Sequence, residues 1–258
     1  MSKSRVLLIS NSRQGDNPYL GHAESSIKAF LGKQVQEALF IPWASVVVSY
    51  EEYTNKVMTR FGEFGIGMKS IHQFPDPVQA IECSQAIVVG GGNTFKLLYE
   101  LQESRVSNVI RRKVENGTPY IGWSAGANIA GPTIMTTNDM PVVWPKSVEA
   151  LNLVPFQINP HYTDAVPPGF SGETRKERIT EFTLLHQKTY VVGMREGAII
   201  TIGEGAARLE GESTKIFLNG KPPMEYKPGD PLEFLLTGED LWRDVLKSYP
   251  KPGKKVLS

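Results

Sequence analysis

Short apolar runs alternate with longer amphipathic stretches through the first half of the chain. β-branched apolar runs predict buried strands, and apolar residues that recur every three or four positions predict helices. On this basis we expect strands at 5–10, 40–45, 65–74, 85–90 and 117–123. Helices are expected at 23–39, 49–65 and 76–84, and over 94–116 with a break near Ser104. Because helices separate the strands, the pattern predicts right-handed crossovers and a mostly parallel sheet with helices on both faces.

The second half of the chain follows a looser pattern. Residues after 133 are rich in loops, 173–187 predict a strong amphipathic helix, and 190–220 predict short strands joined by tight turns. The composition shifts at 219–234, where prolines and glycines gather. We therefore predict an α/β domain over 1–228 and a C-terminal extension over 229–258.

The extension is predicted to contain one short helix. Thr237 followed three residues later by Asp240 resembles a capping box. One helical face then carries four apolar residues, Leu241, Trp242, Val245 and Leu246. This face could pack on the parent domain or on a second copy of the chain. The sequence therefore allows both a monomer and a homo-oligomer.

The overall composition excludes several classes of partner. The 258 residues are 40% hydrophobic and carry a formal net charge of +1, so a sizeable core is expected and no field attracts nucleic acid or a membrane surface. The first apolar stretch is too short for a signal peptide or a membrane span. Cys83 is the one cysteine, which excludes an intrachain disulfide and fits a reducing cytoplasm. We expect Cys83 to pack as a small apolar residue rather than to act as a nucleophile.

The segment after the fifth predicted strand carries the pattern of a nucleophile elbow. Ser124 stands between Gly122 and Gly126 in GWSAG, where the chain passes from strand to helix. Glycines at these positions remove side chains that would clash in so sharp a turn, and they leave the serine hydroxyl exposed. The alternative is that Ser124 only caps the following helix, expected over 125–130.

A serine hydroxyl needs a neighbouring base before it can act as a nucleophile. The chain has four histidines. His161 follows an apolar run and a proline, at a predicted strand end from which it could reach Ser124. His22 is close to the loop after the first strand, His72 lies within a predicted strand, and His186 lies at an exposed helix end. His161 is therefore the favoured base, and a loop histidine bonded to backbone is the alternative.

A carboxylate and an oxyanion hole would complete such a site. Asp139 and Glu196 both lie where a strand meets a loop, and their spacing does not choose between them as partner of the histidine. The backbone N–H groups of Ala125 and of Gly92 in VVGGGNTF are candidates for binding an oxyanion. A phosphate-binding turn is the alternative for the glycines, although neither the dinucleotide spacing nor a P-loop lysine is present.

Six segments in one order resemble the peptidase E family, the α-aspartyl dipeptidases of a serine peptidase family that also contains cyanophycinases. The segments are GGGNTF, YIGWSAGANIAGPTI, TTNDMPVV, ALNLVPFQINPHYTDA, GETRKERI and REG. The likeness spans roughly residues 5–220. It implies a flavodoxin-like three-layer fold similar to class I glutamine amidotransferases, with serine on the elbow where those enzymes carry cysteine.

The resemblance also implies an activity without metal or other cofactor, the hydrolysis of Asp-X dipeptides with a free N-terminus. Ser124 would be the nucleophile and His161 the base. Either Glu196 or Asp139 would be the third member; we favour Glu196, which leaves Asp139 to orient the site or to meet the substrate amine.

Two further positions are candidates for substrate binding. Arg175 matches the family's candidate for binding the aspartate carboxylate, which it would do with two parallel hydrogen bonds. Asn93, at the glycine loop, would lie beside the bound peptide. A cyanophycinase, which cuts a β-aspartyl-arginine polymer in an open cleft, and a non-catalytic binding module on the same fold remain as alternatives.

Overall fold

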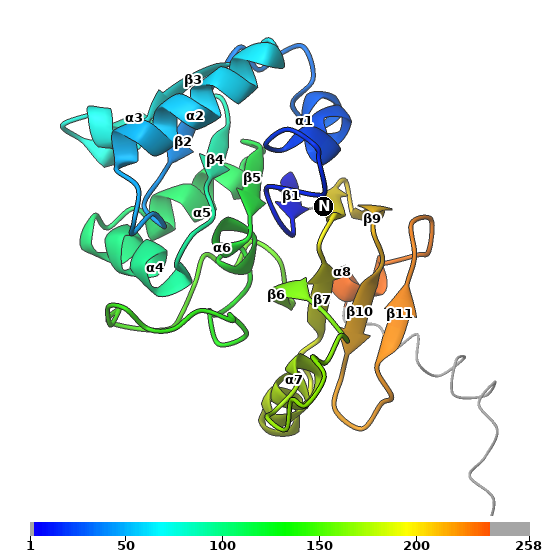
Figure 1. Ribbon diagram of the computed structural model, residues 1–258. Coiled ribbons are helices and arrows are strands. Elements are labelled where there is room, and N and C mark those ends of the chain that lie inside the picture. The colour runs from blue at the N-terminus through cyan, green and yellow to red at the C-terminus, as the bar shows by residue number, and fades with distance from the viewer. Residues whose placement is uncertain (1–2, 238–258) are drawn as a thin grey trace, which may run out of the picture.

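A seven-stranded sheet forms the centre of the computed structural model, which describes residues 3–237 (Figure 1). Its strand order is β3-β2-β4-β5-β1-β8-β9, and the first five strands along the chain run parallel. β8 pairs antiparallel with β1, and β9 pairs antiparallel with β8. The strands are β1 (Val6–Ile9), β2 (Glu37–Ile41), β3 (Gly67–Ser70), β4 (Ile87–Val89), β5 (Tyr120–Trp123), β8 (Ala198–Gly203) and β9 (Ala206–Gly211).

Helices cover both faces of this sheet, because its parallel strands are apolar on both sides. Val6 and Leu8 of β1 pack in one core cluster, and Leu7 and Ile9 pack in the other. Residues of α1 (Glu24–Leu31) and α2 (Tyr50–Glu63) belong to the second cluster. Residues of the remaining main-sheet helices belong to the first, namely α3 (Pro77–Glu82), α4 (Thr94–Glu103), α5 (Ser107–Glu115) and α6 (Ala125–Asn128). The predicted three-layer α/β fold with a mostly parallel sheet is confirmed.

A second sheet of four strands stands beside the main sheet, with α7 on its outer side (Figure 1). Its order is β11-β10-β7-β6, and β6 and β7 run parallel. Ile158, Val192 and Ile216 join it to the large core cluster. Its elements are β6 (Gln157–Tyr162), α7 (Arg175–Leu185), β7 (Val191–Arg195), β10 (Thr214–Phe217) and β11 (Met224–Tyr226).

Helix ends follow the chemistry of the capping residues. Ser49 accepts a hydrogen bond from the Glu52 N–H and begins α2 as predicted. Asp76 caps α3 in the same way, with proline at the first helical position. The helix predicted over 94–116 is divided into α4 and α5, which confirms the expected break near Ser104.

Three sequence-based element predictions are wrong in extent or type. The helix predicted over 23–39 ends at Leu31, because Gly32 takes a left-handed φ of 66° and β2 begins at Glu37. His72 lies in the 3-10 helix η2 (Ile71–Gln73) rather than in a strand; a second such turn, η1 (Gly21–Ala23), precedes α1. α7 is not strongly amphipathic, since only two of its residues, Ile179 and Thr183, are buried.

The described part of the predicted extension packs into the large core cluster. Leu232, Phe234 and Leu235 are buried there, and Phe234–Thr237 form the short helix α8. The helix predicted around Trp242 and Leu246 lies outside the described residues.

Candidate active site

Ser124 lies in a sharp turn between β5 and α6. Its φ of 53° and ψ of −113° fall where residues other than glycine rarely lie. A Cβ at Gly122 would stand 2.1 Å from the Gly126 carbonyl oxygen, and one at Gly126 would stand 2.2 Å from the Val89 carbonyl oxygen. The two glycines are therefore required by close backbone approach. The Ser124 side chain makes no capping hydrogen bond to α6, so the alternative reading of this serine as a helix cap is wrong.

His161 brings its ring to the Ser124 hydroxyl. Its Nε2 lies 2.8 Å from Ser124 Oγ. The residue has a φ of 55° and lies where the pairing of β6 with β7 shifts register. This local irregularity turns the side chain of a strand residue toward the neighbouring sheet.

Glu196 meets the other side of the same ring. Its Oε1 lies 2.9 Å from His161 Nδ1, just after the last residue of β7. A proton on Nδ1 would donate to this carboxylate and leave Nε2 free to accept from the Ser124 hydroxyl. The side chain of Glu196 is 63% exposed and that of His161 is 33% exposed, so water reaches this pair.

Asp139 occupies a different position and does not contact His161. Its Oδ2 accepts hydrogen bonds from the Thr94 N–H at 2.7 Å, from Thr94 Oγ1 at 2.6 Å and from Thr137 Oγ1 at 3.2 Å. A carboxylate at the N-terminus of α4 is favourable because it satisfies free N–H groups and opposes the helix dipole. The two candidate carboxylates thus have different contacts: Glu196 contacts His161, and Asp139 contacts the start of α4.

Gly92 and Ala125 both offer free backbone N–H groups near Ser124. Within residues 3–237 no acceptor bonds to either group. Gly92 has a φ of 141°, and a Cβ there would stand 2.2 Å from the Ala44 carbonyl oxygen. Gly92, Ser124 and His161 line one cavity of about 680 Å³, which is large enough for a dipeptide.

Arg175 lies at the first position of α7 and lines a second hollow together with His161 and Glu196. Its Nη1 is buried without a hydrogen-bond partner among the described residues. Burial lowers the pKa of this guanidinium, and the positive charge of Arg178 lowers it further, while Glu196 and Asp139 act in the opposite direction. Arginine nevertheless stays charged at neutral pH. Nη1 is therefore a buried hydrogen-bond donor that has no acceptor among the described residues.

The Asn93 side chain is used within the protein. Its Oδ1 accepts from the Lys96 N–H at 3.0 Å and caps α4, and its Nδ2 donates to the Met140 carbonyl oxygen at 2.8 Å. Asn93 still lines the 680 Å³ cavity. It therefore shapes the wall of the cavity, and a contact with bound peptide stays a prediction.

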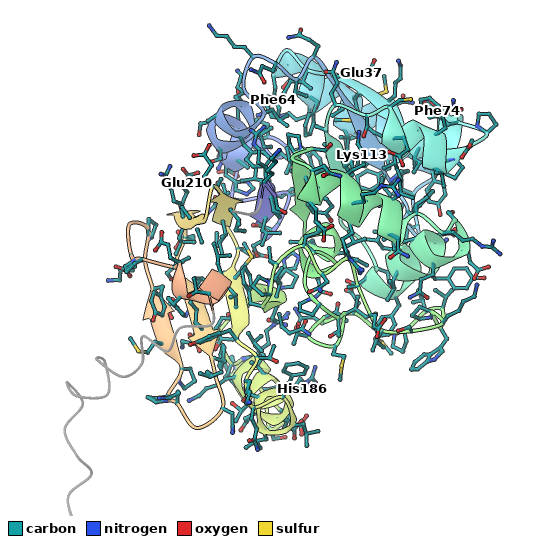
Figure 2. All side chains as sticks on the ribbon, turned by 180° about the vertical axis from the view of Figure 1, so that it is seen from behind. Glu37, Phe64, Phe74, Lys113, His186 and Glu210 are labelled. Carbon is teal, nitrogen blue, oxygen red and sulfur yellow. The ribbon has the colours of Figure 1, made fainter. Side chains whose placement is uncertain are left out.

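The other three histidines lie away from Ser124. Both ring nitrogens of His72 are engaged, with Ser70 Oγ at 2.7 Å and Glu51 Oε2 at 3.2 Å. His22 lines a separate hollow. His186 lies at the end of α7, as Figure 2 shows, and its ring stacks on Phe182 with centroids 4.1 Å apart.

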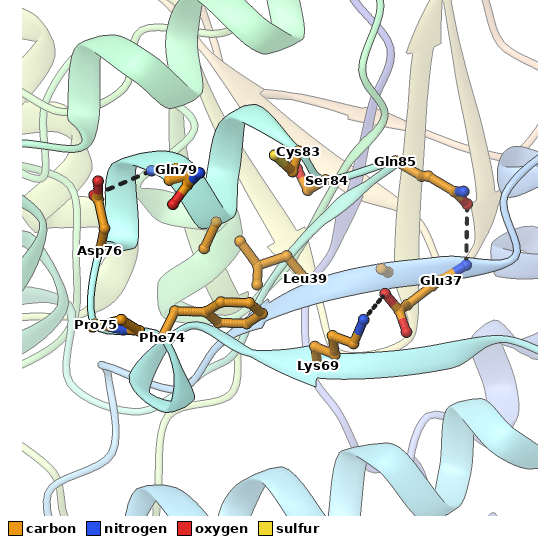
Figure 3. A pocket seen from close by; sticks show the side chains of 12 residues that line it. Glu37, Leu39, Lys69, Phe74, Pro75, Asp76, Gln79, Cys83, Ser84 and Gln85 are labelled. Atoms are coloured by element: carbon orange, nitrogen blue, oxygen red, sulfur yellow. Dashed lines mark hydrogen bonds and ion pairs between the residues drawn. The ribbon is translucent and has the colours of Figure 1, made fainter.

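Cys83 is exposed, which corrects the expectation that it packs as a small apolar residue. It is the C-cap residue of α3, directly after Glu82. Together with Leu39 and Phe74 it lines a shallow pocket over the edge of the main sheet (Figure 3). That pocket shares no lining residue with the cavity at Ser124.

Two buried residues that the sequence did not reveal hold the site together. Ser10 Oγ accepts a hydrogen bond from the His161 N–H and donates to the Met194 carbonyl oxygen, both at 3.0 Å. Asn11 Oδ1 accepts from the Gly197 N–H at 2.6 Å, next to Glu196. The available signal was two polar residues directly after a fully apolar strand, at the carboxyl end where parallel sheets place their sites.

Comparison with known proteins assigns the family. The family model described as "Peptidase family S51" matches residues 6–210, and this range includes every candidate residue named above. The chain belongs to peptidase family S51. Two relatives named peptidase E are similar along most of their length. The protein from Nostoc sp. (strain PCC 7120) is 48% identical over 92% of this chain and 98% of its own. That from Shewanella sp. (strain W3-18-1) is 47% identical over 92% of this chain and 96% of its own.

Family membership confirms the serine dipeptidase class, a hydrolase acting on peptides, that the sequence motifs indicated. The fold agrees with a crystal structure of a peptidase from an acI-B1 Actinobacterium, with a TM-score of 0.65 at 16% identity over 89% of this chain and 96% of that one. None of the helices within residues 3–237 is long and apolar enough to cross a bilayer.

Proposed function

We propose that Ser124, His161 and Glu196 form the catalytic triad of a dipeptidase that hydrolyses Asp-X dipeptides. One observation carries the proposal, a continuous chain of contacts through the histidine ring. Ser124 Oγ lies 2.8 Å from His161 Nε2, and His161 Nδ1 lies 2.9 Å from Glu196 Oε1. A hydroxyl in this setting can pass its proton to an imidazole whose tautomer a carboxylate fixes.

The reaction proceeds through an acyl-enzyme. His161 Nε2 takes the Ser124 proton as Oγ attacks the carbonyl carbon of the N-terminal aspartyl residue. The N–H groups of Gly92 and Ala125 donate to the oxygen that becomes negative. His161 then protonates the leaving amine, and the C–N bond breaks. A water molecule, deprotonated by His161, then attacks the acyl carbon. The bond between this carbon and Ser124 Oγ breaks, His161 returns the proton to Oγ, and aspartate is released.

Arg175 selects the aspartyl residue by binding its side-chain carboxylate. The guanidinium offers paired donors to a carboxylate, and its buried Nη1 has no partner among the described residues. A substrate with an uncharged first residue leaves this buried donor unpaired, at a cost of about 1–3 kcal/mol or more for a charged group. The pocket therefore discriminates by charge rather than by size.

Asp139 supports the site from outside the triad. By binding Thr94 it fixes the start of α4, and the segment that enters α4 carries Gly92. Asn93 acts at the same junction through its cap on α4 and its hydrogen bond to Met140. We further propose a cytoplasmic setting, since one cysteine allows no intrachain disulfide.

The proposal is tested with the full chain and a dipeptide panel that varies the first residue. Ser124→Ala is expected to lower kcat/KM for Asp-Leu by about 10⁴-fold or more. Ser84→Ala, at a serine of the separate pocket beside Cys83, serves as the control. Arg175→Ala should lower kcat/KM for Asp-Leu far more than it lowers kcat/KM for Asn-Leu. Normal turnover by Ser124→Ala, or equal losses on both dipeptides in Arg175→Ala, would contradict the respective role.

A further inference from the structure

The cavity beside Ser124 has an apolar wall that the proposed reaction does not use. Val46 and Val48 line it from the segment between β2 and α2, and Val142 lines it from the long loop after α6. All three side chains are partly exposed to solvent, at 56%, 41% and 53%. Tyr53 and Trp123 close its floor, where Trp123 Nε1 donates to Tyr53 Oη at 3.1 Å.

This wall and Arg175 line two different hollows that share His161. His161 lines both the apolar cavity and a second hollow of about 490 Å³, and Arg175 and Glu196 line only the second. A peptide bond held at Ser124 therefore has one flank toward Arg175 and the other toward the valines. If the aspartyl side chain binds Arg175, the leaving residue enters the apolar cavity.

Lys56 supplies a positive charge at this cavity. It projects from α2, lines the cavity, and its Nζ stands 4.1 Å from the centre of the Tyr19 ring. The Tyr19 ring in turn packs edge to face against the Trp123 ring, with ring centroids 6.2 Å apart. Trp123 directly precedes Ser124 in the chain. Among the described residues no carboxylate lies within 4 Å of Lys56 Nζ, although Glu52 also lines the cavity.

We propose that this cavity is the subsite for the leaving residue, which carries an apolar side chain against the valines and pairs its free α-carboxylate with Lys56 Nζ. The inference rests on the proposed dipeptidase function and adds to it the chemistry of the second residue. Only the last residue of a peptide has a free α-carboxylate, so Lys56 favours dipeptides over longer chains, which present an amide there.

The charges around Lys56 are consistent with this role. Partial burial lowers the pKa of Lys56, and the positive charge of Arg13 lowers it further. An arriving carboxylate relieves both effects, because it stabilises the charged ammonium. Glu52 opposes anion binding at the same cavity, so Glu52→Gln should strengthen, and not weaken, the preference for a free carboxylate.

The experiment compares Asp-Leu with its C-terminal amide in four full-length proteins: wild type, Lys56→Met, Lys56→Arg and Lys33→Met. The readout is the ratio of kcat/KM for the acid to that for the amide, which cancels any general loss of enzyme. The wild-type ratio is expected to be about tenfold, from one charge-assisted hydrogen bond in a partly open cleft. Lys56→Met should bring it to about one, Lys56→Arg should restore most of it, and the exposed Lys33 should leave it unchanged.

A second comparison tests the apolar wall. Leucine and asparagine have nearly the same shape, so Asp-Leu should exceed Asp-Asn by about tenfold in kcat/KM for wild type, and Val46→Asp should reduce that preference. An acid-to-amide ratio that is the same in wild type and Lys56→Met overturns the carboxylate contact. Equal rates for Asp-Leu and Asp-Asn overturn the apolar subsite. If wild type hydrolyses none of these compounds, the dipeptidase function itself is wrong, which separates that failure from failure of the subsite.

Discussion

Replacing Ser10 by alanine should remove a support of the histidine without substituting any catalytic residue. The Ser10 hydroxyl is fully buried and joins two strands of the second sheet, accepting from the His161 N–H and donating to the Met194 carbonyl oxygen. Alanine fills nearly the same space but offers neither group. Two backbone groups then lose their partners in a region with little access to water.

The expected loss can be worked out from those two contacts. A buried polar group left without a partner costs about 1–3 kcal/mol, and the His161 amide is only partly buried, so we expect the free energy of unfolding to fall by about 2–4 kcal/mol. His161 also holds a φ of 55°, a conformation that its surroundings must maintain. A ring displaced by about 1 Å lowers the rate of a positioned reaction by about 100-fold, so kcat should fall about 10- to 100-fold. KM should change little, because Arg175 and the cavity wall are untouched.

The assay measures kcat and KM for Asp-Leu together with urea unfolding, and Thr214→Val is the matched control. Thr214 is also fully buried and donates to a β7 carbonyl, that of Gly193 at 2.9 Å, but it does not touch His161. Thr214→Val should therefore lose stability while keeping kcat. A Ser10→Ala enzyme with wild-type kcat, or equal losses of kcat in both variants, would refute the reasoning.

Three further predictions concern the elbow, the two carboxylates and a half-buried histidine. Gly126→Ala places a Cβ 2.2 Å from the Val89 carbonyl oxygen. It should lower the free energy of unfolding, measured in urea, by about 3 kcal/mol or more. A variant as stable as wild type would show that the β4 backbone can move to accept the Cβ. Asp139→Asn should keep kcat within about threefold, whereas Glu196→Gln should lower it about 10- to 100-fold, less than for a fully buried triad acid; equal effects would count against the assignment. Burial lowers the pKa of His22 below its ordinary value of 6.5, so the unfolded chain binds more protons and wild type loses stability as the pH falls through 6.5. His22→Gln should reduce this dependence by at most about 1.4 kcal/mol per pH unit, and parallel curves of unfolding free energy against pH would contradict it.

The sequence identified the fold class and the residues of the elbow because both depend on local chemistry. Apolar runs separated by helical stretches are enough to predict a parallel sheet, and glycines on both sides of Ser124 are a local demand of a tight turn. The resemblance in ordered motifs added the family, which the comparisons confirm. The length of the first helix was misjudged because residues 32–39 also suit a helix by composition, and pairing of β2 between β3 and β4 decides otherwise.

Only the tertiary structure decided which groups meet. Spacing along the sequence does not choose between Asp139 and Glu196, yet Asp139 lies against the N-terminus of α4 and Glu196 lies 2.9 Å from His161. The support from Ser10 and the exposure of Cys83 were equally hidden. The physical reason is that local propensity and periodicity fix the type of each segment and the face it buries, whereas contacts between distant segments depend on strand order, register and the bulge at His161, which arise only when the whole chain packs.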